Sequence, residues 1–166
     1  MAPTGLSSKP MVHRFEQTIL LPDSVENVFA FHASINNICR LVPDYLVIKI
    51  INAPDQIGLG DKIHIHVSLY KFTFCWDAEI AEYEQNQWFV DTLKKGPFAY
   101  WRHQHLFASK GAETLMTDRI EYEVGFGILG EIAYNLFVLR EIKRIFTTRH
   151  KKALEYFSNK RASMVD

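Results

Sequence analysis

The feature that most constrains the fold is one long amphipathic segment near the carboxy-terminal end of the chain. Between Ile128 and Phe157, apolar residues recur along one stripe of a helical wheel. The stripe comprises Ile128, Ile132, Leu136, Leu139, Phe146, Ala153 and Phe157, and the residues off it include Glu131, Glu141, Thr148, Lys152 and Glu155. A helix of about 30 residues is about 45 Å long. Such a helix needs a broad surface on which to rest its apolar stripe.

A series of strand-like runs supplies that surface. The runs are Val12–Leu21, Tyr45–Asn52, Lys62–Tyr70, Phe74–Glu84, Trp88–Leu93, Trp101–Ala108 and Thr114–Val124, and two helical segments, Val25–His32 and Asn36–Leu41, follow the first run. Several connections are short and rich in turn-forming residues, which favours antiparallel pairing. The order predicts an α+β fold: a curved, seven-stranded antiparallel sheet covered by the long helix. A ligand-sized space is expected between sheet and helix.

The length of 166 residues and the composition predict one domain. We expect it to span residues 12–159, between flexible tails at 1–11 and 160–166. No apolar run approaches the roughly 20 residues that cross a bilayer, and the first residues lack the apolar core of a signal peptide. Cys39 and Cys75 are too few for a disulfide framework. These features predict a cytoplasmic protein.

Two strings resemble those of a known superfamily. FVDTLKKGPFAYWRHQHLF, residues 89–107, and TDRIEYEVGFGILG, residues 117–130, are similar to the last strands and helix entry of helix-grip proteins. This is the START-like or SRPBCC superfamily, which includes lipid carriers, polyketide cyclase/dehydrase proteins and coenzyme Q-binding proteins. The resemblance implies the helix-grip fold and a hydrophobic or amphipathic ligand, such as a lipid, an isoprenoid or quinone, or a polyketide-like molecule.

Strand alternation indicates which side chains face this space. The aliphatic face of 62–70 is expected inside, which leaves His64 and His66 outside. In 101–108, Trp101, His103 and His105 share the inward face. The predicted apolar wall comprises Ile65, Val67, Phe74, Trp76, Trp101, Met116, Ile120, Leu136 and Leu139, and the predicted polar anchors are His103, His105, Asp118 and Tyr122.

Three interpretations of these inward polar groups stay open. They can satisfy one another, for instance His105 with Asp118, and simply stiffen the sheet, because an unpaired buried polar group is costly. Alternatively, they form the polar end of a ligand site. In a third, enzymatic hypothesis, His103 or His105 with Asp118 performs the acid–base chemistry of a cyclase or dehydratase, as the resemblance implies. The carrier interpretation is preferred over the enzyme.

Metal and cofactor sites are not expected. His103 and His105 are two residues apart and could share an ion with Asp118, but such pairs arise by chance in a chain with seven histidines, and His64 with His66 is a second pair. Residues 125–130 spell GxGxxG, yet no further strand or acidic ribose partner follows. We therefore predict neither a metal ion nor a nucleotide cofactor.

The charge distribution suggests one further partner. Lys and Arg number 19 and Asp and Glu number 19, so the chain has no net charge to attract nucleic acid. Residues 140–161 nevertheless carry a local excess of basic side chains: Arg140, Lys143, Arg144, Arg149, Lys151, Lys152, Lys160 and Arg161. This helix face could contact anionic lipid or an acidic protein weakly. No nucleic-acid partner is expected, because aromatic residues do not alternate with these cations.

Overall fold

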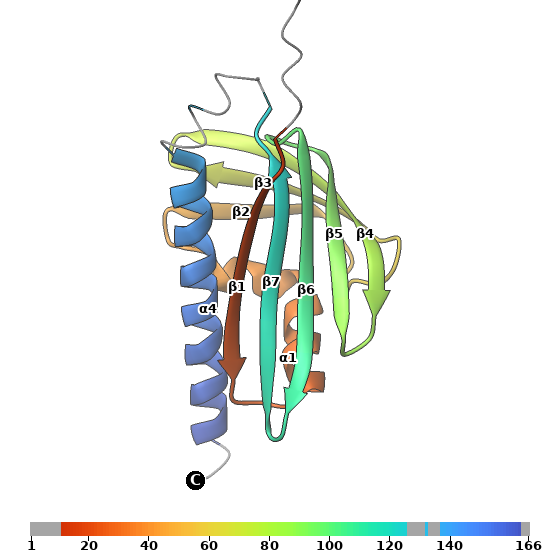
Figure 1. The fold of residues 1–166 in the computed structure, drawn as a ribbon, viewed down its shortest axis with the longest axis vertical. Coiled ribbons are helices and arrows are strands. Elements are labelled where there is room, and N and C mark those ends of the chain that lie inside the picture. The colour runs from red at the N-terminus through yellow and green to blue at the C-terminus, as the bar shows by residue number, and fades with distance from the viewer. Residues whose placement is uncertain (1–10, 126–131, 133–136, 164–166) are drawn as a thin grey trace, which may run out of the picture.

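Seven antiparallel strands form one sheet that curls around the helices in this computed structural model, which describes residues 11–125, 132 and 137–163 (Figure 1). The strands are β1 (His13–Leu21), β2 (Leu46–Asn52), β3 (Lys62–Leu69), β4 (Phe72–Glu84), β5 (Trp88–Lys95), β6 (Tyr100–Lys110) and β7 (Glu113–Glu123). Their order is β1-β7-β6-β5-β4-β3-β2. The helices are α1 (Val25–Ala33), α2 (Ile35–Leu41) and α4 (Leu139–Ala162). The predicted α+β helix-grip architecture is confirmed.

The curvature of the sheet has a local cause in its hydrogen-bond register. The register shifts between Ile50 and Asn52 in β2, and twice in β4, at 77/78 and 80/82. Such bulges bend a strand and increase its twist. β2 and β3 consequently run across the view behind the upright strands β1 and β7 (Figure 1).

The hairpin of β3 and β4 is tighter than the sequence indicated. Its register continues until Leu69 pairs with Phe72, so only Tyr70 and Lys71 form the turn. The predicted start of the second strand at Phe74 is therefore wrong by two residues. Tyr70 adopts a φ of 54°, a conformation usually left to glycine or asparagine. The turn contains neither residue, so its sequence carries no turn signal.

Helix α4 packs against β1 and α2. Its predicted beginning, from Ile128, falls partly outside the described residues, and Ile132 is half exposed rather than buried. At the other end the helix continues to Ala162, beyond the predicted end, and Lys160 binds Asp23 at 2.7 Å. Among the described residues, no helix has both the length and the apolarity needed to cross a bilayer.

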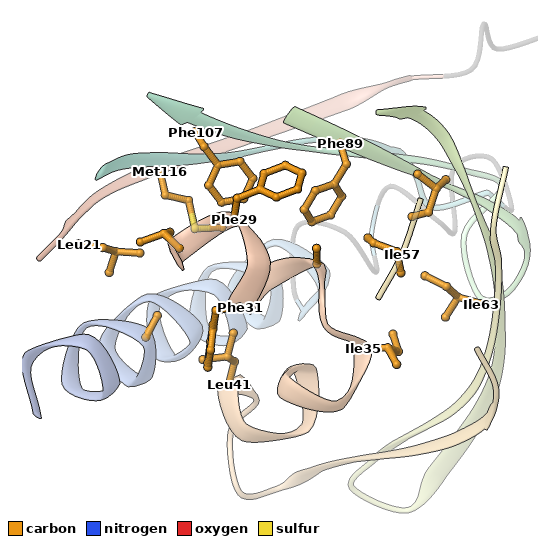
Figure 2. Close-up of a cluster of buried hydrophobic side chains, with 14 of the residues drawn as sticks. Leu21, Phe29, Phe31, Ile35, Leu41, Ile57, Ile63, Phe89, Phe107 and Met116 are labelled. Atoms are coloured by element: carbon orange, nitrogen blue, oxygen red, sulfur yellow. The ribbon is translucent and has the colours of Figure 1, made fainter. Parts of the chain in front are cut away.

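The core lies in two clusters under this helix. In the larger cluster, Phe29 of α1 lies beside Phe89 and Phe107 of the sheet (Figure 2). The Ser24 side chain accepts a hydrogen bond from the Asn27 backbone N–H and so caps α1. The smaller cluster joins the sheet to the first half of α4 and contains Trp101, Ile120, Tyr122, Ile142 and Phe146.

Candidate functional site

A cavity of about 420 Å³ lies between the sheet, the two short helices and α4. Its walls are mostly aliphatic and aromatic, and their polar side chains include His32, Asp91, His103, His105, Glu141 and Arg149. Seven residues that the sequence placed on its wall do line it: Ile65, Val67, Phe74, Trp76, Trp101, His103 and His105. Its volume falls within the range of small-molecule sites.

Five other predicted wall residues do not reach this cavity: Met116, Asp118, Ile120, Tyr122 and Leu139. Met116 belongs to the larger core cluster, and Ile120 and Tyr122 pack with Ile142 and Phe146 in the smaller one. An inward face of β7 is therefore filled by the helix instead of being left open. Leu136, also predicted to line the wall, lies outside the described residues.

Three histidines surround the fully buried carboxylate of Asp118. Nε2 of His103 donates to its Oδ1 at 2.8 Å, and Nε2 of His150 donates to its Oδ2 at 2.7 Å. Nδ1 of His105 lies 3.0 Å from Oδ1. Alternation along β6 turns His103 and His105 to the face on which Asp118 of β7 lies, and His105 pairs with Asp118 in the register. Helix α4 contributes His150. The sequence correctly placed His103, His105 and Asp118 inside.

A second carboxylate joins this group from β5. Oδ2 of Asp91 lies 3.4 Å from Nδ1 of His103 and 3.4 Å from Nε2 of His105. Asp91, His103 and His105 line the cavity, whereas Asp118 and His150 lie behind them. We call these five residues the buried His–Asp cluster. Three of its residues face the cavity. Behind them, Asp118 contacts both His103 and His105, and His150 in turn binds Asp118.

Sequence reasoning missed two members of the buried His–Asp cluster. Neither His150 nor Asp91 was among the predicted site residues. A signal for Asp91 was present, because it alternates with Phe89 on one face of the strand, and Phe89 is buried. His150 gave no local signal, since only the tertiary structure brings α4 over β7.

The cluster shifts the ionisation of its members. Burial lowers the pKa of His103, but the charge of Asp91 and hydrogen bonds to Asp118 and Asp91 outweigh it, so the pKa is raised. Burial likewise raises the pKa of Asp118, and its three histidine partners lower it well below the ordinary value. The pKa of Asp91 is lowered for the same reason. The arrangement favours a protonated His103 between two carboxylates.

We expect the stability of the protein to be greatest near pH 6.5. Burial lowers the pKa of His32 to about 3, so below about pH 6.5 only the unfolded chain takes up this proton. Between pH 6.5 and 5 the free energy of unfolding should fall by up to about 1.4 kcal/mol per pH unit. Above pH 6.5 the unfolded chain has released the His103 proton while the folded chain still holds it. The free energy of unfolding therefore falls as the pH rises through the raised pKa of His103 in the folded protein.

Urea unfolding at pH 5, 6.5 and 8 measures this profile. The matched variant is His32→Phe, which removes the titrating ring and should flatten the acid side of the profile while leaving the alkaline side. A urea midpoint of the unmodified protein that is higher at pH 5 than at pH 6.5 would contradict the expectation.

A separate polar group lines the cavity at the beginning of α4. Glu141 was predicted to lie off the apolar stripe, but it is 4% exposed. Tyr45 donates to its Oε2 at 3.3 Å and Tyr70 at 3.4 Å, while the Arg144 guanidinium lies 4.4 Å from the centre of the Tyr45 ring. The prediction failed because the sheet curls around this end of the helix and encloses a side that helical periodicity alone assigned to solvent. Burial, together with the Glu141 charge, raises the pKa of Tyr45 to about 12.

We expect Glu141→Met to stabilise the protein by about 1 kcal/mol, because a buried carboxyl group costs free energy when its hydrogen bonds, at 3.3 and 3.4 Å, and its ion pair with Arg140, at 4.0 Å, are all long. The matched control is Glu155→Met on the same helix, where the side chain is 59% exposed, and we expect a change within about 0.5 kcal/mol. Urea unfolding compares the two. A destabilised Glu141→Met variant would show instead that this carboxyl group supports the fold.

The cavity wall also contains a possible set of metal donors. Asp91, His103 and His105 each offer one ligand atom within 4.8 Å of the others. Both ring nitrogens of His103 face carboxylates, at 2.8 and 3.4 Å, and its raised pKa favours a proton on each. A proton on a ring nitrogen prevents that nitrogen from binding a metal. The chemistry of Asp91, His103 and His105 therefore fits hydrogen bonds among these side chains better than it fits a bound metal ion.

Solved structures with the same fold come from several organisms. An aromatase/cyclase, Zhui from Streptomyces sp. R1128, has a TM-score of 0.70 and 12% identity, covering 89% of this chain and 94% of its own. A START superfamily protein from Mycobacterium smegmatis has a TM-score of 0.68 and 13% identity, covering 89% and 98%. A norcoclaurine synthase from Thalictrum flavum has a TM-score of 0.64 and 12% identity, covering 90% and 99%. At these identities the likeness shows the fold.

The family of this protein follows from its sequence. No curated protein matches it. The family described as polyketide cyclase / dehydrase and lipid transport matches residues 21–151, which include both short helices, six of the seven strands and the first half of α4. The chain therefore belongs to the polyketide cyclase/dehydrase and lipid transport family.

Proposed function

We propose that this protein binds and carries a hydrophobic or amphipathic small molecule in the cavity. The observation that carries the proposal is the cavity itself, with largely apolar walls and the buried His–Asp cluster at one place on them. Apolar walls give affinity for a hydrocarbon body, and a few fixed polar groups orient a head group. A lipid, an isoprenoid or quinone, or a polyketide-like ring system has this character.

The polar groups of the cavity narrow the kind of head group. Asp91, His103 and His105 present donors and acceptors from the sheet, and Glu141 presents an acceptor from α4. A ligand with oxygen functions separated by an apolar body can meet both places. A plain alkane can contact only the apolar walls and gains nothing from these polar groups.

Blocking the cavity tests the proposal. Ile65→Trp puts a large ring where a buried side chain lines the cavity, whereas Val47→Trp puts the same ring on an exposed position of the neighbouring strand. An amphipathic fluorescent probe, 1-anilinonaphthalene-8-sulfonate, should bind Ile65→Trp at least about tenfold more weakly than Val47→Trp, a loss of about 1.4 kcal/mol. Equal affinity of the two variants would refute the proposal.

The natural ligand can be sought directly. The protein purified from its host should yield a bound apolar compound on organic extraction and mass spectrometry, and the Ile65→Trp variant purified in parallel should yield none. The same compound at the same level in both preparations would show that it does not occupy this cavity.

A second candidate function is acid–base catalysis in the same cavity, of the cyclase or dehydratase type. The observation favouring it is that two imidazoles, His103 and His105, line the cavity with ring centres 3.8 Å apart. A neutral imidazole can accept a proton from carbon next to a carbonyl, while a protonated one delivers a proton to a departing hydroxyl, so that water leaves. The aromatase/cyclase Zhui, which has the same fold, supports this class.

His105→Gln distinguishes the two functions. A catalyst should lose turnover of a β-hydroxy carbonyl substrate and keep much of its affinity for it, whereas a carrier has no turnover to lose. Absence of any turnover by the unmodified protein would favour the carrier.

The basic face of α4 supports a weak contact with anionic lipid or an acidic protein less strongly than the sequence indicated. Lys152 binds Asp44 at 2.9 Å, Lys160 binds Asp23 at 2.7 Å, and Arg149 lines the cavity. These cations already have partners within the domain. We expect any such contact to rest on the exposed Lys143 and Lys151, and charge reversal at both should abolish sedimentation with anionic liposomes if it occurs.

A further inference from the structure

Four side chains of types that commonly bind metals lie together on the outer face of the sheet, away from the cavity. His64 and His66 lie on β3, and Cys75 and Asp77 lie on β4. The register places His64 opposite Asp77 and His66 opposite Cys75. Their neighbours in each strand turn to the cavity, so alternation directs these four outward. They form two cross-strand pairs, one above the other.

The donor atoms of these pairs are close together. One ligand atom each of His64, His66 and Cys75 lies within 4.8 Å of the others. Sγ of Cys75 is 3.3 Å from Oδ1 of Asp77 and 3.9 Å from Nδ1 of His64, and His64 also contacts Asp77 directly. Donors around a tetrahedral Zn²⁺ with bonds of about 2.0–2.3 Å are about 3.3–3.8 Å apart. The distances from Cys75 to Asp77 and to His64 already lie close to that range.

We propose that His64, His66, Cys75 and Asp77 form a tetrahedral site for one Zn²⁺ ion or a similar divalent transition metal. Thiolate and imidazole donors favour such ions over Mg²⁺ and Ca²⁺. The thiolate and the carboxylate together balance the charge of the ion, while Lys49 and Lys95, which pair with His66 and Asp77 in the sheet, disfavour any additional cation. The side chains of His64 and Asp77 are 38% and 33% exposed, so an ion can enter from solvent.

The position of this site links it to the fold. The residues that alternate with the ligands are Ile65, Val67, Phe74 and Trp76, which line the cavity. An ion that joins β3 to β4 from outside therefore stiffens one wall of the cavity. Because the ion binds the folded state, it also raises the unfolding temperature in proportion to the logarithm of its concentration.

Titration of the reduced protein with Co²⁺ tests the site without any substitution. One equivalent should give the intense visible bands of tetrahedral cobalt together with a thiolate-to-cobalt charge-transfer band, and Zn²⁺ should displace both. Weak octahedral bands, or tetrahedral bands without the thiolate transition, would overturn the proposal, as would no binding at all.

Matched variants locate the ion. Cys75→Ser should remove the charge-transfer band and weaken Co²⁺ binding by at least about tenfold, because the thiolate is the soft donor of the set. Cys39→Ser, at the other cysteine, should leave both unchanged. His66→Gln should also weaken binding and should lose the metal-dependent rise in unfolding temperature. A cobalt spectrum that survives Cys75→Ser but disappears in His105→Gln would place the ion in the cavity and overturn the assignment.

Discussion

Replacing Asp118 by asparagine is expected to lower the free energy of unfolding by about 3–5 kcal/mol, because removing one partner of a buried ionic group strands the others. Asp118 is fully buried, and both of its oxygens accept hydrogen bonds from histidines. The raised pKa of His103 depends partly on this carboxylate. Asparagine keeps the shape, but it has no charge and only one acceptor oxygen.

Asp44→Asn is the matched control for this substitution. Asp44 also forms an ion pair, with Lys152 at 2.9 Å, but its side chain is 98% exposed. Exposed pairs contribute about 0–1 kcal/mol, so this variant should remain close to the unmodified protein in urea unfolding. A loss of less than about 1 kcal/mol for Asp118→Asn would mean that the buried His–Asp cluster does not depend on the charge of its central carboxylate.

The Asp118→Asn variant also bears on the proposed function. Asp118 does not line the cavity, so any effect on a ligand must pass through His103 and His105, which do. Asp118 is in this sense a positioning residue. We expect the variant to alter the pH dependence of ligand binding more than the affinity at a single pH.

Phe29→Ala should destabilise the protein by about 3–5 kcal/mol, the usual cost of deleting a buried aromatic ring. Phe29 is 3% exposed, and its ring centre lies 5.5, 5.8 and 5.1 Å from those of Tyr83, Phe89 and Phe107. It fastens α1 to the sheet, as Figure 2 shows for its position beside Phe89 and Phe107. Loss of the ring leaves a void that the surrounding strands can fill only partly.

Phe72→Ala removes the same ring from a position that is 69% exposed, and we expect a change within about 0.5 kcal/mol. Urea unfolding of both variants gives the comparison. Similar losses at the two positions would contradict the packing described here. The last residues of α1, 31–33, line the cavity. Phe29→Ala should therefore also weaken binding of 1-anilinonaphthalene-8-sulfonate.

Local pattern predicted the elements and their inward faces well. On β6, alternation placed Trp101, His103 and His105 inside, and all three are buried. On β7 it placed Asp118 inside, which is also correct. These predictions succeed because strand geometry sends successive side chains to opposite faces, whatever the rest of the fold does. The tight turn at Tyr70 was missed because its conformation is imposed by the hairpin and not by its own residue type.

Predictions that depended on how α4 packs against the sheet were less successful. Tyr122 faces inward as expected, yet Phe146 and Ile142 of α4 pack with it, and it does not line the cavity. Glu141 lies off the apolar stripe and is nevertheless enclosed, since the curled sheet reaches around the helix. Whether an inward side chain meets a space or another side chain depends on how two surfaces fit.

The amino-acid order by itself determined the sequence of strands and helices, the inward faces of β3, β4, β6 and β7, and the family, because these follow from periodicity and local motifs. Only the tertiary structure decided that His150 of α4 completes the partners of Asp118, that Asp91 joins them, and where the cavity remains open. These contacts join residues far apart in the chain, and their distances depend on the bulged curvature of the sheet and the docking of α4. No pattern within a single element specifies that docking.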